Sequence, residues 1–416
     1  MNILLLKAYY NPEVAASQYL TDNLLEDFAK ENIHMTLHVP SPTRGVSDEV
    51  RRQYKQKKHE VKYDGKLEVY RFRMFKEDKK PLQRFLRYIS SHVIHFIKGV
   101  QEKNTDLLLI TSTPPTLGAL SVFVKKIKKI PMVYILQDVF PDSLVGAGLT
   151  KKNSLLWKIG RMIENFTYRN ADKIIVISED MKTNIMKKGV PESKIEVIYN
   201  WVDENKVYPV SRIDNKLFDE FKLSRNDFYV VYAGNLGHAQ NIDIILDAAE
   251  RLKELEDIKF LIFGSGGLEK ELKEKAHVMN ITNLQFLPIQ PVERVPEVYG
   301  LGNVSVVSCK AGLGESAMPS KTWNIMACGT CVLANFDKDS DLQKIIENNK
   351  VGLFTIAGDI EGFTTAIKTL YEKPFLCESY GNNGRDFIIK NLSRKIGTSK
   401  YLEVIKSVKN GTNKQN

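Results

Sequence analysis

The sequence predicts two successive α/β domains, each built on a doubly wound parallel sheet. Three observations lead to this fold class. The chain has 416 residues, too many for one ordinary hydrophobic core. Short, uniformly apolar runs alternate with helical segments, a pattern typical of parallel strands that helices cover on both faces. The alternation stops between residues 201 and 227, where the chain is charged and lacks a long apolar run, and then it restarts.

The first half contains the strands expected for an N-terminal domain, which we place at residues 1–205. The apolar runs are residues 3–6, 34–39, 107–111, 132–136 and 173–177. Helices are expected at about 17–31 and at 179–188, the second one capped by Ser178. The strands are separated by segments long enough for the crossover helices that a parallel sheet requires.

The second half repeats the pattern and predicts a C-terminal domain at residues 222–395. Its expected strands are residues 228–233, 258–263, 304–308 and 331–334, with a helix at 241–255. The segment after Thr412 is polar and is expected to fray.

Composition places the chain among ordinary globular proteins, with 43% hydrophobic and 26% charged residues. No stretch reaches the roughly 18 apolar residues of a membrane span. The apolar start is too short for a signal peptide and lacks a basic region before it, so we expect a cytoplasmic location.

The positive charge is uneven. Residues 44–103 contain 17 Lys and Arg against 8 Asp and Glu, nearly the whole excess of a chain whose net charge is +10. Such a segment fits an anionic membrane surface, nucleic acid, an anionic substrate or simply a solvated face. No recognised nucleic-acid motif surrounds it, which disfavours nucleic acid.

One predicted helix in this segment has a strong apolar stripe. Apolar residues recur at three- and four-residue spacing, with basic residues elsewhere around the helix: Leu82, Phe85, Leu86, Ile89, Val93, Phe96 and Ile97. Two interpretations stay open. The stripe either packs against the sheet or lies on a membrane surface, and the basic surroundings add to the second.

Cys328 and Cys331 form a single Cys-x-x-Cys. Redox or zinc chemistry is one interpretation, and two small residues in a helix-to-strand turn is the other. Since there is no second pair and no nearby His, we favour the turn and expect no metal site here.

Candidate site residues follow the carboxyl ends of the predicted strands, where doubly wound sheets bind ligands. In the first domain these positions include Asn11, Pro12, Thr113, Gln137 and Asp138. In the second domain they are the glycine turns 234–237 and 264–267 and the polar run 312–321. Glycines let a backbone approach a diphosphate, and a helix start near Ser320 and Lys321 offers N–H groups and a cation to an anion.

Several segments together resemble the retaining glycosyltransferases of family 4. They are residues 172–178, 189–191, 194–203, 232–237, 263–267 and 319–329, in the order of that family. The forms at 137–142 and 200–201 resemble the subgroup that builds bacterial surface polysaccharides, including WbuB-like N-acetylfucosamine transferases. The resemblance implies the GT-B fold, in which two Rossmann-like domains face a cleft and a C-terminal helix, here about 396–412, crosses back to the first domain.

The resemblance also implies a nucleotide diphosphate-sugar bound mainly by the second domain, without a metal or other cofactor. Two departures from the family pattern bear on the site. Ser316 and Asn324 stand where the family has a pair of Glu, and Glu315 is adjacent. Asn235 and Gln240 stand where it has Arg and Lys, which leaves Lys321 as the best local cation for the diphosphate.

The sequence therefore predicts a metal-independent glycosyltransferase that makes capsule or O-antigen polysaccharide. From the resemblance we expect a UDP-linked donor, such as an N-acetylated amino sugar, and a lipid-linked or saccharide acceptor, at the inner face of the cell membrane. The alternatives are a non-catalytic sugar-nucleotide-binding scaffold and a nucleotide-sugar epimerase of the same fold. The assigned residues are Asp138, Glu315 and Lys321 for catalysis; Gly234, Asn235, Gly237, Gln240, Gly264, Gly266, Pro319, Ser320 and Asn324 for the donor; and Asn11, Pro12, Ser17, Thr113 and Gln137 for the acceptor.

Overall fold

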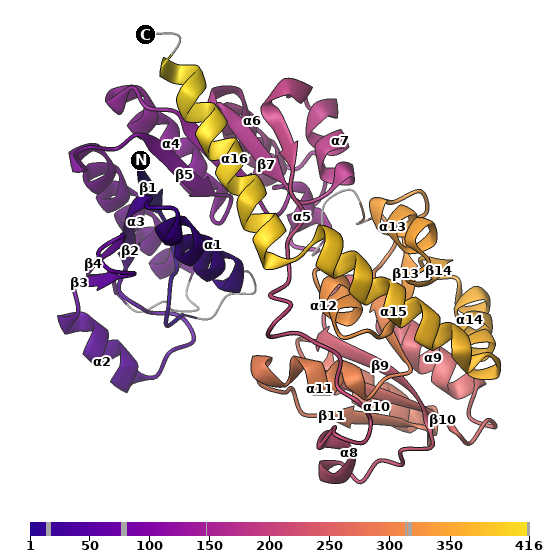
Figure 1. Cartoon of the computed structure of the whole chain (residues 1–416). Coiled ribbons are helices and arrows are strands. Elements are labelled where there is room, and N and C mark those ends of the chain that lie inside the picture. The colour runs from indigo at the N-terminus through magenta and orange to yellow at the C-terminus, as the bar shows by residue number, and fades with distance from the viewer. Residues whose placement is uncertain (14–17, 76–80, 147, 313, 315–317, 414–416) are drawn as a thin grey trace. The chain divides into compact units, whose positions relative to one another are not determined.

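The chain divides into two compact units in the computed structural model (Figure 1). One unit comprises Met1–Asp142, Lys151–Tyr199 and Gly397–Asn416, and the other comprises Ser143–Thr150 and Asn200–Ile396. The structure describes residues 1–13, 18–75, 81–146, 148–312, 314 and 318–413. Each unit contains one sheet.

The first unit contains a mixed sheet whose described strands lie in the order β3-β4-β2-β1-β5-β6-β7-β8. The strands are β1 (Asn2–Leu6), β2 (His34–Pro40), β3 (His59–Lys62), β4 (Leu67–Phe72), β5 (Leu107–Thr111), β6 (Met132–Leu136), β7 (Lys173–Val176) and β8 (Ile195–Val197). All neighbours pair in parallel except β3 and β4, which form an antiparallel edge. This edge was not expected from the sequence, because β3 is four residues long and three of them are polar.

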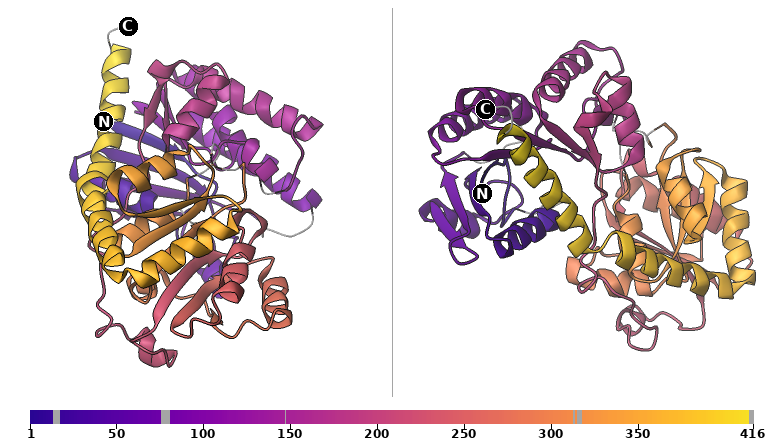
Figure 2. Two further views of the ribbon diagram at one scale, coloured as in Figure 1. Left: turned by 90° about the vertical axis from the view of Figure 1, so that its right-hand side faces the viewer. Right: turned by 45° about the horizontal axis from the view of Figure 1, so that its top comes forward.

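The helices of the first unit lie on both faces of its sheet. They are α1 (Gln18–Lys30), α2 (Asp48–Gln56), α3 (Pro81–Gln101), α4 (Pro115–Lys128), α6 (Leu155–Asn170), α7 (Glu179–Lys187) and most of α16 (Arg394–Asn413), with α5 (Asp142–Gly146) at its border. In the left panel of Figure 2 the yellow α16 lies on one side of the strands, and purple and magenta helices lie on the other. Thr398 of α16 donates to Asp27 of α1 at 3.1 Å, so these two helices share a layer.

Helices α3, α4 and α6 form the opposite layer, and small residues bring them close together. A Cβ atom at Gly99 of α3 would lie 3.2 Å from Val124 of α4. A Cβ atom at Gly118 of α4 would lie 3.0 Å from Thr167 of α6. These contacts define the three helices as one side-by-side helical layer.

The second unit has a wholly parallel sheet in the order β11-β10-β9-β12-β13-β14 among the described residues. Its strands are β9 (Phe228–Asn235), β10 (Ile258–Ser265), β11 (Leu284–Leu287), β12 (Val304–Ser308), β13 (Cys331–Phe336) and β14 (Gly352–Ile356). Its helices are α8 (Leu217–Glu220), α9 (Asp243–Arg251), α10 (Glu269–Val278), α11 (Val295–Gly300), α12 (Lys321–Ala327), α13 (Asp341–Asn349), α14 (Ile360–Glu372) and α15 (Pro374–Asn391). Numbered along the chain, this order is 3-2-1-4-5-6, that of a Rossmann fold.

The core of the second unit explains why its strands are apolar throughout. Alternate residues of β9 enter different clusters of buried side chains: Val230 and Tyr232 belong to one, and Tyr229 and Val231 to the other. Since successive side chains of a strand point to opposite faces, both faces of the sheet are covered. The prediction of two doubly wound parallel-sheet domains is confirmed.

Two local predictions can be compared with the structure. The expected helix at 241–255 is shorter, and α9 spans Asp243–Arg251. Cys328 directly follows α12, Cys331 begins β13, and both are buried free thiols, in agreement with the turn interpretation. Between them Gly329 has a φ of 67°, a conformation that favours glycine at a helix end.

None of the helices in the described part of the chain is long and apolar enough to cross a lipid bilayer.

Candidate active site

The candidate donor site lies at the carboxyl edge of the second sheet, where the strand order reverses between β9 and β12. Ligands of open α/β sheets bind outside the carboxyl ends of the strands at such a point. Strand β9 ends in Gly234 and Asn235, and β12 ends in Ser308, directly before Cys309. Helix α12 begins beside them with Lys321.

Lys321 places its side chain over this switch point. Its Nζ lies 3.8 Å from the centre of the Tyr232 ring. A Cβ atom at Gly234 would lie 2.6 Å from the same Nζ, so a larger residue there would displace the amine. Gly234 also has a φ of 152°, which side chains other than glycine rarely allow. Gly234 of β9 and Lys321 of α12 are therefore packed directly against each other.

The Lys321 amine is buried without a hydrogen-bond partner among the described residues. Burial lowers its pKa to about 7, and a Cys309 thiolate would act in the opposite direction. A buried ammonium without a counter-charge is costly, so this amine favours an anionic ligand over an empty site. Lys321, the cation predicted from the sequence, is therefore placed where an anionic group such as a diphosphate would stabilise its charge.

Cys309 lies beside Lys321, and Asp337 lies near Cys309; neither residue was predicted from the sequence. Burial, reinforced by Asp337, raises the pKa of the Cys309 thiol to about 12, so it is neutral and does not pair with the amine. The Asp337 carboxylate accepts from the backbone N–H groups of Gly312 at 2.8 Å and Gly314 at 2.7 Å. The signal was available, since each residue directly follows a strand of the sheet.

The turn after β9 brings three other predicted donor residues together. The Asn235 side chain donates to Gln240 at 3.2 Å, and a Cβ atom at Gly237 would lie 2.6 Å from the Asn235 amide nitrogen. Ser308 donates to the Gln240 carbonyl at 2.7 Å, which fastens the turn to β12. Two neutral amides thus occupy the positions where the resembling family has cations, and Lys321 is the adjacent positive group.

Gly264 and Gly266 have a structural explanation. A Cβ atom at Gly264 would lie 2.3 Å from the carbonyl oxygen of Gly234, and one at Gly266 would lie 2.4 Å from that of Leu236. Both glycines therefore allow the ends of β9 and β10 to pack closely, whether or not a ligand is bound. That Gly264 and Gly266 contact the donor stays a prediction.

The remaining donor-side residues lie on or next to α12. Pro319 and Ser320 precede this seven-residue helix, and the Ser320 side chain makes no capping hydrogen bond. Asn324 lies half-buried one turn further along the helix. Glu315 lies outside the described residues, as does Ser17 of the acceptor side.

In the first unit, the described acceptor-side candidates and the catalytic candidate Asp138 lie at the carboxyl edge of its sheet. They follow β1, β5 and β6, which are neighbours in the strand order: Asn11, Pro12, Thr113, Gln137 and Asp138. The Asn11 side chain donates to Asp22 at 2.9 Å, and the Gln137 N–H donates to Ser112 at 3.1 Å. The Asp138 residue is exposed to solvent, yet partial burial of its carboxyl group raises the pKa of that group.

Lys7 is a further polar group at this edge that the sequence analysis missed. It directly follows β1, and burial lowers its pKa to about 8, with Asp22 opposing. Its Nζ donates to Thr21 at 2.6 Å. The described residues hold no group of three His, Cys, Asp or Glu placed to bind a metal ion.

Family models match both halves of the chain. The model "Glycosyltransferase Family 4" matches residues 18–206, and "Glycosyl transferases group 1" matches residues 214–387. They lie one after the other and cover most of the sequence. The chain therefore belongs to the glycosyltransferases of the family 4 and group 1 type.

Particular relatives are bacterial. The chain is 28% identical to the probable glycosyltransferase WbjE of Pseudomonas aeruginosa, over 66% of this chain and 68% of that one. It is 25% identical to the putative colanic acid biosynthesis glycosyl transferase WcaI of Escherichia coli, over 83% and 86% of the two chains.

Solved structures agree on the fold. HepE of Anabaena in complex with UDP superposes with a TM-score of 0.73 at 16% identity, covering 98% of this chain and 100% of that one. Sucrose-phosphate synthase of Thermosynechococcus elongatus gives a TM-score of 0.76 at 15% identity, with 98% of each chain covered. The two α/β domains of this chain thus have the GT-B fold.

Proposed function

We propose that this glycosyltransferase moves a sugar, with retention at the anomeric carbon, from a UDP-linked donor to a lipid-linked or saccharide acceptor. The pathway is capsule or O-antigen synthesis, at the cytoplasmic face of the cell membrane. The names of WcaI and of the Staphylococcus aureus capsular polysaccharide enzyme CapM support the pathway. HepE, crystallised with UDP-glucose, supports the nucleotide. The N-acetylated amino sugar and the WbuB-like subgroup rest on the sequence resemblance.

The single observation that carries the proposal is the buried Lys321 amine at the β9–β12 switch point. The diphosphate would sit against Lys321 and the turn 234–240. Because negative charge grows on the departing diphosphate, a preorganised cation stabilises the transition state more than the bound donor. The neutral Cys309 thiol leaves the Lys321 charge to the ligand.

The other roles follow the same division of the chain. Residues 222–395 would bind the donor, and residues 1–205 with the helix at 396–412 would provide the acceptor side. Asp138 would contact the transferred sugar or the acceptor, and burial raises the pKa of its carboxyl above the ordinary value of an Asp. Glu315 would orient the donor sugar.

A substitution at Lys321 tests the proposal. Lys321→Ala should keep its fold by circular dichroism but lose up to about 3 kcal/mol of donor affinity, the range of a charge-assisted hydrogen bond. The loss in kcat should be larger still. Lys310→Ala, which removes an exposed cation from the same loop, is the matched control and should behave as wild type. Wild-type binding and turnover in Lys321→Ala would place the diphosphate elsewhere.

A panel of nucleotide-sugars scored by thermal shift identifies the donor, since a ligand that binds the native state stabilises it by mass action. Transfer to an acceptor must accompany binding. Binding without transfer would indicate a scaffold, and an altered free nucleotide-sugar would indicate an epimerase.

A further inference from the structure

Helix α3 presents its apolar stripe to solvent and its polar stripe to the protein. Its inward residues recur every four positions and are buried: Arg87, Ser91, His95 and Gly99. Its outward residues Leu86, Ile89, Val93 and Ile97 are 50%, 46%, 52% and 45% exposed. The interpretation that this stripe packs against the sheet is therefore wrong for these four residues, whereas Phe96 of the stripe is half-buried.

Specific contacts hold the polar side of α3 inward. Arg87 donates to the Thr43 hydroxyl at 2.7 Å, and the His95 ring lies 3.1 Å from the carbonyl oxygen of Lys7. Burial lowers the pKa of His95 to about 4, so the ring is neutral in this position. Because Arg87 and His95 reach these partners only in this orientation, a rotation that buried the apolar side of the helix would break both contacts.

The apolar surface continues across the helical layer of α3, α4 and α6. Phe123 and Ile127 of α4 are 52% and 55% exposed, and Leu155 and Met162 of α6 are 76% and 66% exposed. The rings of Phe123 and Phe166 lie 5.6 Å apart and join α4 to α6. Side-by-side exposure on three helices exceeds the scattered apolar residues of an ordinary surface.

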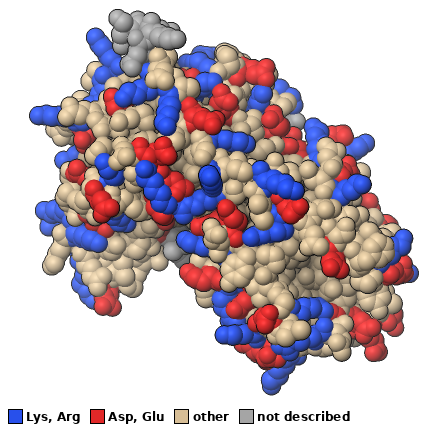
Figure 3. Space-filling model, viewed as in Figure 1, with Lys and Arg blue, Asp and Glu red and all other residues tan. Residues whose placement is uncertain are grey.

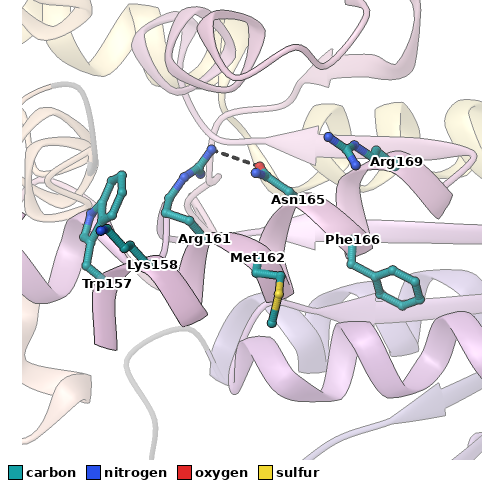
Figure 4. Close-up of a pocket in the computed structure, with 7 residues that line it drawn as sticks. All are labelled: Trp157, Lys158, Arg161, Met162, Asn165, Phe166 and Arg169. Carbon is teal, nitrogen blue, oxygen red and sulfur yellow. Dashed lines mark hydrogen bonds between the residues drawn. The ribbon is translucent and has the colours of Figure 1, made fainter. Parts of the chain in front are cut away.

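A hollow of about 460 Å³ lies along α6 within this surface (Figure 4). Apolar and basic side chains line it together: Trp157, Lys158, Arg161, Met162, Asn165, Phe166 and Arg169. Arg161 donates to Asn165 at 2.9 Å, while Met162 and Phe166 point away from that pair in the close-up. Such a lining suits a molecule with an apolar chain and an anionic head.

Charge distinguishes the helical layer from the rest of the surface. The sequences of α3 and α4 contain no Asp or Glu, and α6 contains only Glu164, which is fully buried. Lys98, Lys126 and Lys158 are exposed there. On the face drawn in Figure 3, by contrast, acidic and basic side chains are interspersed.

We propose that the helical layer of α3, α4 and α6 is a docking surface for an anionic lipid bilayer. Apolar side chains of all three helices would enter the headgroup region, and the Lys and Arg side chains would pair with lipid phosphates. A second copy of the chain is a poorer occupant, because it would bring three helices with exposed cations and no exposed carboxylate of their own against the same three helices. The inference rests on the proposed function, because an enzyme that acts on a lipid-linked acceptor must reach the membrane surface.

Vesicle sedimentation with the full chain tests the surface. Wild type should bind phosphatidylcholine–phosphatidylglycerol vesicles at low salt, bind pure phosphatidylcholine vesicles far less, and lose affinity as salt rises. The variants Val93→Glu/Ile159→Glu and Lys126→Glu/Lys158→Glu should each weaken binding at least about tenfold.

Two controls carry the same chemical changes elsewhere. Val278→Glu replaces an 83% exposed apolar residue of the second unit. Lys373→Glu/Lys400→Glu reverses two exposed cations that do not belong to the three helices of the layer. Both controls should bind vesicles as wild type does. Equal binding by the layer variants and wild type, or no preference of wild type for anionic vesicles, would overturn the docking surface.

Two further measurements separate this inference from the others. Light scattering that shows a wild-type dimer abolished by Val93→Glu/Ile159→Glu would assign the face to a second copy and overturn the lipid proposal. Thermal stabilisation by UDP should be the same in wild type and in every layer variant. If UDP fails to stabilise wild type, the proposed function fails, while the vesicle result still decides the docking surface.

Discussion

At the residue scale, the candidate site depends on close approaches that a linear sequence does not show. Lys321 could be chosen from the sequence because it follows Pro319 and Ser320 at a helix start and because cations are missing from the preceding glycine turn. Its burial against Tyr232 could not, since the two residues belong to separate elements that only the folded sheet brings together. The same packing makes the amine a titratable group near neutral pH.

This titration predicts a pH dependence of donor binding. Burial sets the pKa of Lys321 to about 7 in the unliganded protein, whereas a bound diphosphate favours the charged amine. Binding therefore takes up a proton above pH 7, and affinity should fall by up to about tenfold per pH unit between roughly pH 7 and 9. Below pH 7 the amine is already charged, so affinity should level off.

Calorimetry with the tightest nucleotide-sugar of the panel, in buffers of different ionisation enthalpy, measures that proton directly. A nucleotide-sugar is the right probe because its diphosphate has no proton to exchange in this range. Lys321→Arg should bind without the pH dependence, because guanidinium stays charged. An unchanged profile in Lys321→Arg would assign the titration to another group.

The glycines after β10 give a second residue-scale prediction. Gly266→Ala would force a Cβ atom to 2.4 Å from the Leu236 carbonyl oxygen, and backbone cannot yield as a flexible side chain does. We expect a loss of about 1–3 kcal/mol in the free energy of unfolding, measured with urea. The neighbouring Gly267→Ala is the control, since a Cβ atom there meets nothing within 4 Å. Equal stability of the two variants would contradict the packing role.

At the element scale, the bounds of most strands in both sheets were predicted from the sequence to within one or two residues. Which side of a helix faces the protein was not always predictable. Uniformly apolar runs identify buried parallel strands such as β5 and β6, whose bounds agree with the expected 107–111 and 132–136. The spacing in α3 predicted a helix without saying which side faces inward, because hydrophobic periodicity is the same for a buried stripe and for an exposed one. The edge pair β3 and β4 was missed because polar residues interrupt both strands, so neither contains a continuous apolar run.

A buried ion pair on this edge gives the element-scale prediction. Arg71 of β4 donates to Glu60 of β3 at 2.7 Å, and the two side chains are 0% and 6% exposed. Burial alone would raise the pKa of Glu60, but hydrogen bonds from Arg71 and Lys57 outweigh it and hold the pKa below its usual range. The pair therefore stabilises the fold above the ordinary Glu pKa and loses that contribution as pH falls through the lower, folded-state value.

Removing one partner should cost more than the pair contributes. Glu60→Gln leaves Arg71 buried beside a neutral group, for an expected loss of about 3 kcal/mol in urea unfolding at pH 7. Glu68→Gln on β4 is the control. It removes a carboxylate that is 44% exposed and should change stability by about 0.5 kcal/mol or less. Similar losses in both variants would show that the edge responds to charge in general rather than to the buried pair.

At the scale of the whole molecule, two Rossmann-type sheets divide the predicted chemistry between them. The parallel part of each sheet reverses its strand order once, between β1 and β5 and between β9 and β12, and the described candidate residues lie at the carboxyl ends of these strands, of their neighbours β6 and β10, or on or next to α12. The repeated alternation of strand and helix was sufficient to predict this arrangement. The sugar, acceptor and linkage were not predictable, because they depend on side chains from several loops, some of which, such as Glu315, lie outside the described residues.

The assignment of Lys321 to the diphosphate predicts that sugar transfer does not need a divalent metal ion. If Lys321 supplies the positive charge for the departing diphosphate, added divalent metal has no necessary role, and transfer should continue in EDTA at an unchanged kcat. Lys321→Ala sharpens the experiment, since in that variant Mg²⁺ or Mn²⁺ paired with the diphosphate could replace the missing charge and restore part of the lost rate. Wild-type transfer that EDTA abolishes and Mn²⁺ restores would show that a metal ion carries the charge assigned to Lys321.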